Sequence, residues 1–345
     1  MTEQTLASLG WTPHFARQAL AAPDLTPARV AEVHRSHLVI FGATGAQELP
    51  VKGSTGDFAV GDWVLHDGAR VLQRLEPVTQ IARRIAGTTS ERQLIAANVD
   101  TLGIVTSCNL DFNVARLDRY LATAVGAGCR PLIVLTKADQ ADDPDTYLQQ
   151  ARALSPLVTA VTIDARDGAD VARLAPWAGP GQTLALVGSS GVGKTTIMNA
   201  LTGGDAATQG IREDDARGRH TTTFRALRPT LAGGWLIDTP GMREMALSEA
   251  GAGIAAVFAD IAALALDCRF GDCSHDREPG CAVQAAIAAG TLDEGRLRRL
   301  QKLEREDRFN TEAAHERNER ARAFGRAIRS GKARGRHKRG GPEGD

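Results

Sequence analysis

The clearest chemical signal in this sequence is an eight-residue pattern, G-x-x-x-x-G-K-[ST], that binds phosphate groups. Glycines at these spacings let backbone N–H groups converge on phosphate oxygens, and the lysine adds a positive charge beside the β and γ groups. The threonine hydroxyl can ligate Mg²⁺, and the next threonine extends the binding loop. Apolar residues before the pattern and a helix expected after it favour a P-loop over a chance match. The residues are Gly188, Ser189, Ser190, Gly191, Val192, Gly193, Lys194, Thr195 and the following Thr196.

A second motif, Thr136-Lys137-Ala138-Asp139, fits the [NT]-K-x-D pattern with which GTPases read guanine. The Asp139 carboxylate can accept hydrogen bonds from N1 and N2 of guanine. Adenine presents an acceptor at N1 and would leave the carboxylate unpaired, which makes the contact selective. Lys137 is expected to pack its aliphatic stem over the base. Alone, this short motif also allows a loop lysine and aspartate with no role.

Three further segments complete the expected nucleotide site. Asp164-Ala165 fall where a guanine-contacting loop, usually Ser-Ala, belongs, although aspartate replaces the serine. Asp238-Thr239-Pro240-Gly241 fits D-x-x-G, in which Asp238 would hold Mg²⁺ through water and the Gly241 amide would sense the γ-phosphate. Between this motif and the P-loop, Thr222 is expected to reach Mg²⁺. Met242 follows Gly241 where many GTPases place a water-orienting glutamine, so His220 is the candidate catalytic residue, unless it is only a histidine on a loop.

The order of these motifs is unusual. The guanine-reading motif precedes the P-loop by about fifty residues, whereas in ordinary GTPases it follows it. A guanine-nucleotide site is therefore expected in a chain that runs through it in permuted order.

A cluster of metal-ligating residues lies near the C-terminal end: Cys268, Cys273, His275 and Cys281. Three thiolates and one imidazole make a closed tetrahedral set suited to one structural Zn²⁺, with no open position for catalysis. Buried cysteines without metal are the alternative. The other two cysteines, Cys108 and Cys129, are expected to be small buried residues, and a disulfide framework is not expected in a chain of this size and compartment.

Composition is that of an ordinary globular protein of 345 residues, with 43% hydrophobic and 24% charged residues and a net charge of +0. No segment has the apolar length of a membrane span or the pattern of a secretory signal, so a cytoplasmic protein is expected. The zero charge conceals an asymmetry, because residues 296–339 hold about sixteen Lys and Arg against about six Asp and Glu. A basic end on an acidic body favours a polyanionic partner, with a solubilising tail as the alternative.

The periodicity of apolar residues predicts several parts in one multidomain α/β chain. Residues 1–30 form a lead-in broken by prolines, and residues 31–88 form short strands separated by glycines, as in a small barrel. Residues 89–247 alternate strands and helices, which indicates a parallel sheet with helices on both faces. Residues 248–310 are helical around the cysteine cluster, with one alanine-rich helix expected over 248–266. Residues 311–345 form a basic, disordered tail.

Taken together, these motifs resemble the ribosome small-subunit-dependent GTPases, the RsgA or YjeQ family. The resemblance extends over about residues 31–308 and includes Gly61-Asp62-Trp63-Val64, Ala97-Asn98-Val99-Asp100 and Asp111-Phe112-Asn113 beside the permuted motifs and the cysteine cluster. It implies an N-terminal OB-type β-barrel, a circularly permuted P-loop GTPase domain and a C-terminal helical zinc-binding domain. It also implies GTP/GDP with Mg²⁺, His220 as the hydrolysis residue, and a role in late maturation of the small (30S) ribosomal subunit.

The leading expectation is a GTP hydrolase, active as a monomer, that binds 16S rRNA and leaves the subunit on hydrolysis. An RNA-binding scaffold that is merely ordered by its nucleotide is the main alternative. A kinase that uses ATP is a third possibility, against which the Thr136–Asp139 motif argues.

Overall fold

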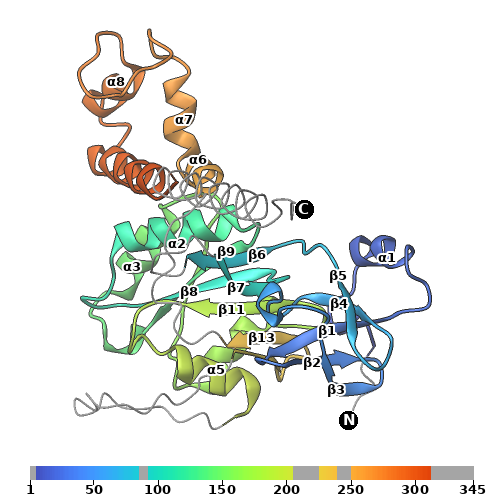
Figure 1. Ribbon diagram of the computed structural model, residues 1–345. Coiled ribbons are helices and arrows are strands. Elements are labelled where there is room, and N and C mark those ends of the chain that lie inside the picture. Colours follow the sequence, from blue (N-terminus) through green and yellow to red (C-terminus); the bar gives the residue numbers. More distant parts are fainter. Residues whose placement is uncertain (1–4, 85–91, 205–224, 239–249, 312–345) are drawn as a thin grey trace, which may run out of the picture.

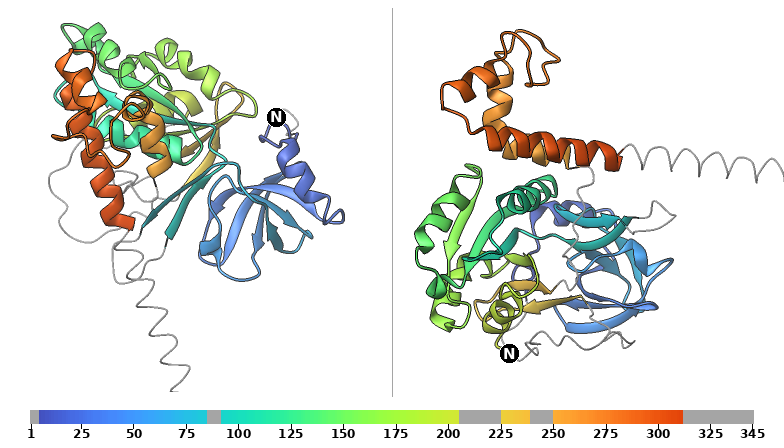
Figure 2. Two further views of the ribbon diagram at one scale, coloured as in Figure 1. Left: turned by 90° about the horizontal axis from the view of Figure 1, so that it is seen from above. Right: turned by 90° about the vertical axis from the view of Figure 1, so that its left-hand side faces the viewer.

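The computed structural model describes residues 5–84, 92–204, 225–238 and 250–311, in three parts (Figures 1 and 2). An antiparallel, barrel-like sheet lies beside a largely parallel α/β sheet, and a helical lobe stands on one face of the latter. No helix within the described ranges is both long and apolar enough to span a membrane.

The α/β part contains the parallel strands expected from the apolar runs. Its sheet has the order β10-β9-β8-β11-β13, followed by the antiparallel strand β12. Helices α2 and α3 cover one face and α5 covers the other (Figure 1). Every residue of β8 and β11 is buried, as two covered faces require. The strands are β8 (Thr101–Ser107), β9 (Arg130–Thr136), β10 (Thr159–Thr162), β11 (Thr183–Val187), β12 (Ala226–Pro229) and β13 (Trp235–Asp238).

The helices of this part begin where the sequence supplies capping residues. The Asn113 side chain accepts a hydrogen bond from the backbone N–H of Arg116 at the start of α2, and Asp143 accepts one from Thr146 at the start of α3. Besides α5 (Lys194–Thr202), these helices are α2 (Val114–Gly126), α3 (Pro144–Arg152) and the short α4 (Gly168–Val171), with 3-10 turns at η2 (Ala138–Gln140) and η3 (Ala172–Trp177).

The first strand of the barrel-like part, β1, starts at Thr26. Strand β1 pairs antiparallel with β2 and with β4, and at Glu32↔Ala226 it also joins the α/β sheet through β12. A hairpin of β6 and β7 follows. The strands are β1 (Thr26–Val33), β2 (His37–Gly42), β3 (Gly45–Pro50), β4 (Trp63–His66), β5 (Val71–Arg74), β6 (Gln80–Arg84) and β7 (Arg92–Ala97), with η1 (Thr55–Asp57) before β4 and α1 (Pro13–Ala19) before β1.

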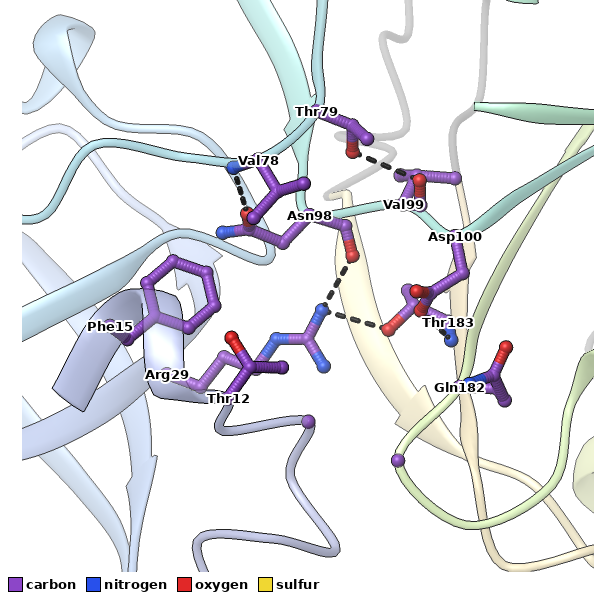
Figure 3. Close-up of a pocket in the computed structure, with 12 residues that line it drawn as sticks. Thr12, Phe15, Arg29, Val78, Thr79, Asn98, Val99, Asp100, Gln182 and Thr183 are labelled. Atoms are coloured by element: carbon purple, nitrogen blue, oxygen red, sulfur yellow. Dashed lines mark hydrogen bonds between the residues drawn. The ribbon is translucent and has the colours of Figure 1, made fainter. Parts of the chain in front are cut away.

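A buried arginine joins these two parts. Arg29, on β1, is 1% exposed and donates to the carbonyl oxygens of Leu9 at 2.7 Å and Asn98 at 3.0 Å and to the hydroxyl of Thr183 at 2.8 Å. Figure 3 shows the guanidinium between Asn98 and Thr183, beside a cavity of about 170 Å³. Burial lowers the pKa of Arg29 to about 10, against the charges of Asp100 and Asp62. The side chain remains charged at neutral pH and ties the lead-in, the barrel and the first strand residue of β11 together.

The helical lobe contains more breaks than expected. The single helix predicted over 248–266 is two, α6 (Gly251–Val257) and α7 (Ala259–Ala265), because Phe258 leaves helical geometry and buries its ring completely. The Arg296 guanidinium lies 4.6 Å from that ring's centroid. Helix α8 (Ala282–Ala288) and a helix over 294–311 complete the lobe.

The lobe packs on α2 through a close helix contact at Gly253 and an ion pair between Arg299 and Asp118. A Cβ atom at Gly253 would lie 2.0 Å from the carbonyl oxygen of Ala122, so only glycine lets α6 approach α2 this closely. Beside this contact, Arg299 Nε donates to the fully buried carboxylate of Asp118 at 2.7 Å. Arg296 donates to both carboxylate oxygens of Asp260 and to the carbonyl oxygen of Leu154.

Candidate functional site

The predicted nucleotide motifs meet at one edge of the α/β sheet. The Thr136–Asp139 motif follows β9, the P-loop follows β11, and Asp238 ends β13. Since β9, β8, β11 and β13 are parallel neighbours, these residues share the carboxyl edge, where open α/β sheets bind ligands.

The P-loop has backbone geometry that its glycines make possible. Gly188 has φ 141°, and a Cβ there would lie 2.1 Å from the carbonyl oxygen of Val105. Gly193, with φ 98°, precedes the first residue of α5, so the positive end of that helix faces the loop. Lys194 Nζ donates to the carbonyl oxygen of Gly188 at 2.9 Å and to that of Ser189. The loop is thus shaped as a phosphate cradle with the ammonium group against its backbone.

The Thr136–Asp139 motif is hydrogen-bonded directly to the P-loop. Thr136 is fully buried, and its hydroxyl lies 2.7 Å from the carbonyl oxygen of Val192 and 3.2 Å from that of Thr106. A Cβ added at Gly193 would lie 3.4 Å from that of Ala165, so the 164–166 loop packs against the same turn. Segments separated by more than fifty residues therefore form one site, as the permuted order requires.

Asp139 lies at the open end of this site. Its carboxylate Oδ2 is 2.5 Å from Nη2 of Arg166, and the Asp139 side chain is 31% exposed. Lys137, between Thr136 and the η2 turn, has φ 56°, a left-handed conformation that is uncommon outside glycine. The strained turn directs the chain from the buried end of β9 to the exposed Asp139.

Several predicted residues cannot be placed. His220, Thr222 and Gly241 lie outside the described residues, and Asp238 is described only through its backbone pairing with Ala226. Thr195 is exposed and Thr196 half-buried in the first turn of α5. The roles assigned to these residues stay predictions.

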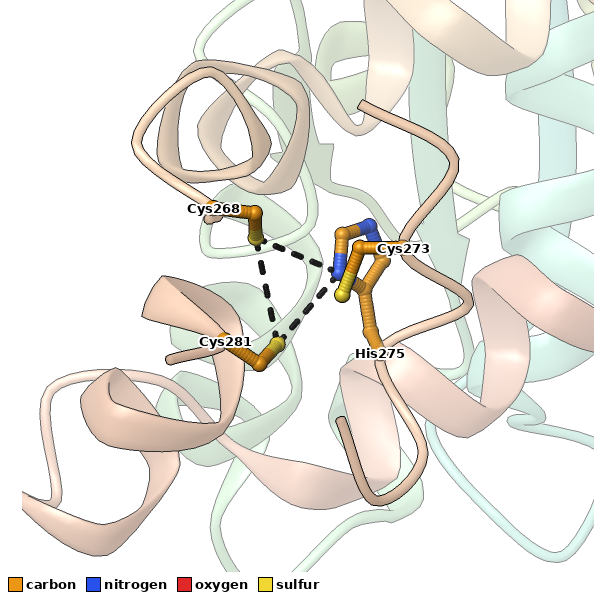
Figure 4. Close-up of side chains that lie close together, drawn as sticks. All are labelled: Cys268, Cys273, His275 and Cys281. Atoms are coloured by element: carbon orange, nitrogen blue, oxygen red, sulfur yellow. Dashed lines mark hydrogen bonds between the residues drawn. The ribbon is translucent and has the colours of Figure 1, made fainter. Parts of the chain in front are cut away.

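The cysteine cluster forms a compact set of ligand atoms (Figure 4). Its four ligand atoms all lie within 4.8 Å of one another. Nδ1 of His275 is 3.6 Å from Sγ of Cys268 and 3.5 Å from Sγ of Cys281, and the two sulfurs are 3.9 Å apart. Bonds of about 2.3 Å to sulfur and about 2.0 Å to nitrogen give tetrahedral edges of about 3.5–3.8 Å. These residues therefore fit a structural Zn²⁺, with Nδ1 as the histidine ligand.

The loop around this cluster is held by a carboxylate that the sequence did not single out. Glu278 accepts from the backbone N–H groups of Ser274, Asp276 and Arg277 at 2.9–3.1 Å. Hydrogen bonds from Ser274 and the backbone lower the pKa of Glu278 to about 2. Gln284, on α8, donates to the carbonyl oxygen of His275 at 2.6 Å. These contacts shape the loop that carries Cys273 and His275.

The other cysteines are buried, as expected. Burial raises the pKa of the Cys108 thiol to about 11 and that of Cys129 to about 12, so both are protonated at neutral pH. Neither has the low-pKa surroundings that a reactive thiol needs.

Comparison with known proteins identifies the family to which this chain belongs. The family model of the RsgA GTPase matches residues 75–248. The small ribosomal subunit biogenesis GTPase RsgA of Mesorhizobium japonicum is 51% identical over 316 residues, which is 89% of this chain and 91% of that protein. RsgA 2 of Vibrio parahaemolyticus is 46% identical over 334 residues, 95% and 93% of the two chains.

Solved structures share the fold at lower identity. YjeQ from Thermotoga maritima matches with a TM-score of 0.59 and 21% identity, over 81% of this chain and 97% of that one. YloQ, described as a circularly permuted GTPase, matches with a TM-score of 0.57 and 20% identity, over 86% and 96% of the two chains. The permuted order of the motifs therefore has a structural counterpart.

Proposed function

Because this chain belongs to the RsgA family of GTPases, we propose that it binds GTP with Mg²⁺ where the P-loop meets the Thr136–Asp139 motif. Hydrolysis yields GDP and phosphate, and the protein acts in biogenesis of the small ribosomal subunit. The observation that supports this proposal is the 2.7 Å contact of the Thr136 hydroxyl with the Val192 carbonyl oxygen, which joins the Thr136–Asp139 motif to the P-loop.

The proposed roles follow from the chemistry of each segment. The P-loop amides and Lys194 hold the β and γ phosphates, and Asp139 accepts from N1 and N2 of guanine. Thr195, Thr222 and Asp238 would hold Mg²⁺, which supplies charge neutralisation at the phosphates. His220 would orient the attacking water, and Gly241 would sense the γ-phosphate.

We propose that Cys268, Cys273, His275 and Cys281 hold one Zn²⁺ that stabilises the helical lobe. All four positions of a tetrahedron are filled by protein atoms, so the ion has a structural and not a catalytic part. The 3.5–3.9 Å distances among the ligand atoms of Cys268, His275 and Cys281 support this.

The partner that suits the chain is ribosomal RNA. We propose that the protein acts as a monomer in the cytoplasm, where the barrel and the basic residues beyond 311 bind 16S rRNA. The proposed parts of the chain are the lead-in over 1–30, the barrel over 31–88, the GTPase domain over 89–247, the zinc-binding domain over 248–310 and the tail over 311–345. Loss of the γ-phosphate would move the loop over 241–247 and so reorient the helical lobe. Release from the subunit would follow hydrolysis.

The experiment that tests this function is GTP turnover with and without purified small ribosomal subunits. We expect turnover that rises with added subunits, together with a His220→Ala variant that binds GTP, hydrolyses it much more slowly and stays on the subunit. A protein whose turnover is negligible in both conditions would be the nucleotide-ordered scaffold instead. Normal release of the His220→Ala variant would contradict the coupling of hydrolysis to release.

A further inference from the structure

The carboxylate expected to read guanine has a partner that the nucleotide motifs do not specify. Arg166 Nη2 lies 2.5 Å from Asp139 Oδ2, across 27 residues of chain. Both residues stand at the carboxyl edge of the sheet, Asp139 after β9 and Arg166 after β10, which pair in parallel. The Arg166 side chain is 65% exposed, so it is not part of the packed core.

The position of Arg166 is set by Asp164, the residue that departs from the usual serine. Asp164 Oδ1 accepts from the backbone N–H of Arg166 at 2.9 Å and lies 3.4 Å from Nε of the same residue. The backbone N–H of Asp164 is in turn held by Asp170 Oδ2 at 2.7 Å. The two carboxylates thus fix both the turn and the direction of the guanidinium, which points to Asp139.

We propose that Arg166 is a positioning residue for guanine specificity: it holds the Asp139 carboxylate in the orientation that accepts from N1 and N2 of the base. The inference rests on the proposed guanine site. A carboxylate oxygen has two acceptor positions, so Oδ2 can keep the contact with Arg166 while it accepts from the base. Asp164, which stands in the place of the usual serine, then orients Arg166, and Arg166 in turn orients Asp139.

Calorimetric titration of the full chain with GDP, inosine diphosphate and ADP tests this. Inosine diphosphate lacks the 2-amino group and so reports on one of the two contacts of Asp139. We expect Arg166→Ala to weaken GDP binding about two- to fivefold, the range of an exposed ion pair, and to lower the ratio of GDP to inosine diphosphate affinity. Arg166→Lys should restore part of both. Asp164→Ala should cause a smaller loss in the same direction.

Arg298→Ala is the matched control, since Arg298 is 70% exposed and lies 2.5 Å from Glu294 in a surface pair on the helix over 294–311. It should bind all three nucleotides as the wild type does. In an Asp139→Ala background, Arg166→Ala should add no further loss, because the group that it positions is gone.

Three results would overturn the inference. Arg166→Ala could leave GDP affinity and base preference at the level of the Arg298→Ala control. It could tighten GDP binding, which would make the ion pair an obstacle to the base. It could also weaken binding equally with and without Asp139, which would mean direct contact of Arg166 with the nucleotide. A wild type without guanine preference would instead contradict the guanine site itself, so the two failures are distinct.

Discussion

The hydroxyl of Thr136 lies 2.7 Å from the backbone carbonyl oxygen of Val192 and joins the end of strand β9 to the P-loop. The two residues are 56 positions apart in the sequence. The contact depends on β9 and β11 being parallel neighbours of β8. Permuting the chain changes which loop comes first, but not which strand ends lie together.

Replacing Thr136 with valine should therefore damage both stability and nucleotide binding. The substitution keeps the shape of the side chain but removes its single O–H donor, so the buried carbonyl oxygen of Val192 loses the hydrogen bond from Thr136. We expect a loss of about 1–3 kcal/mol in the free energy of unfolding, measured with urea, and weaker GDP binding. Thr136→Ser keeps the hydroxyl and should retain most of both. A valine variant with wild-type affinity would show that this bond does not shape the P-loop.

Changing Asp139 to asparagine should alter the base that is preferred. The amide can donate to O2 of xanthine but no longer offers two acceptors to guanine. We expect GDP affinity to fall about tenfold or more and xanthosine diphosphate affinity to rise. Competition between the two nucleotides for the variant measures this. Unchanged preference for GDP would remove Asp139 from the base-binding site.

Removing one cysteine ligand should release the metal and unfold the loop around it. Cys268→Ser should reduce bound zinc from one equivalent to near zero, measured by elemental analysis, and make residues 266–290 sensitive to protease. GDP binding should persist, because the nucleotide motifs lie in the α/β part. Cys129→Ala is the control, since Cys129 is buried beside the sheet and far from the cluster in sequence. Equal zinc content in both variants would contradict the four-ligand site.

The ion pair between Asp118 and Arg299 should hold the lobe to α2. Arg299→Met leaves the Asp118 carboxylate buried without its main partner, which costs about 3 kcal/mol or more. We expect earlier unfolding in urea and faster proteolysis between the α/β part and the lobe. Arg298→Ala, one position away but in an exposed pair, should change neither. If both variants unfold alike, the ion pair between Asp118 and Arg299 does not hold the lobe to α2.

The apolar runs and the P-loop motif predicted much of the fold, because each depends on residues that are neighbours in the sequence. The apolar runs at 101–106 and 183–187 are buried strands, and the helix after Lys194 begins at the motif itself. The break at Phe258 was not predicted, because it depends on burial of one ring and on Arg296, 38 residues later.

The candidate site was predicted as a set of motifs but not as a set of contacts. Residue types and their spacing predicted the P-loop, the Thr136–Asp139 motif and the metal ligands. They could not identify Arg166, because one arginine in a loop carries no periodicity, and its partner Asp139 lies on another strand end. The carboxylate at 164 was a visible departure from the family pattern, and it was the signal that could have led to Arg166.

The most direct test of the account is calorimetric titration of the purified chain with GDP and with ADP in the presence of Mg²⁺. The account predicts clear preference for GDP, lost when Asp139 is changed to alanine while Lys194-dependent phosphate binding remains. Equal affinity for the two nucleotides in the folded wild type would contradict it, because the Thr136–Asp139 motif would then not read the base that the P-loop holds by its phosphates.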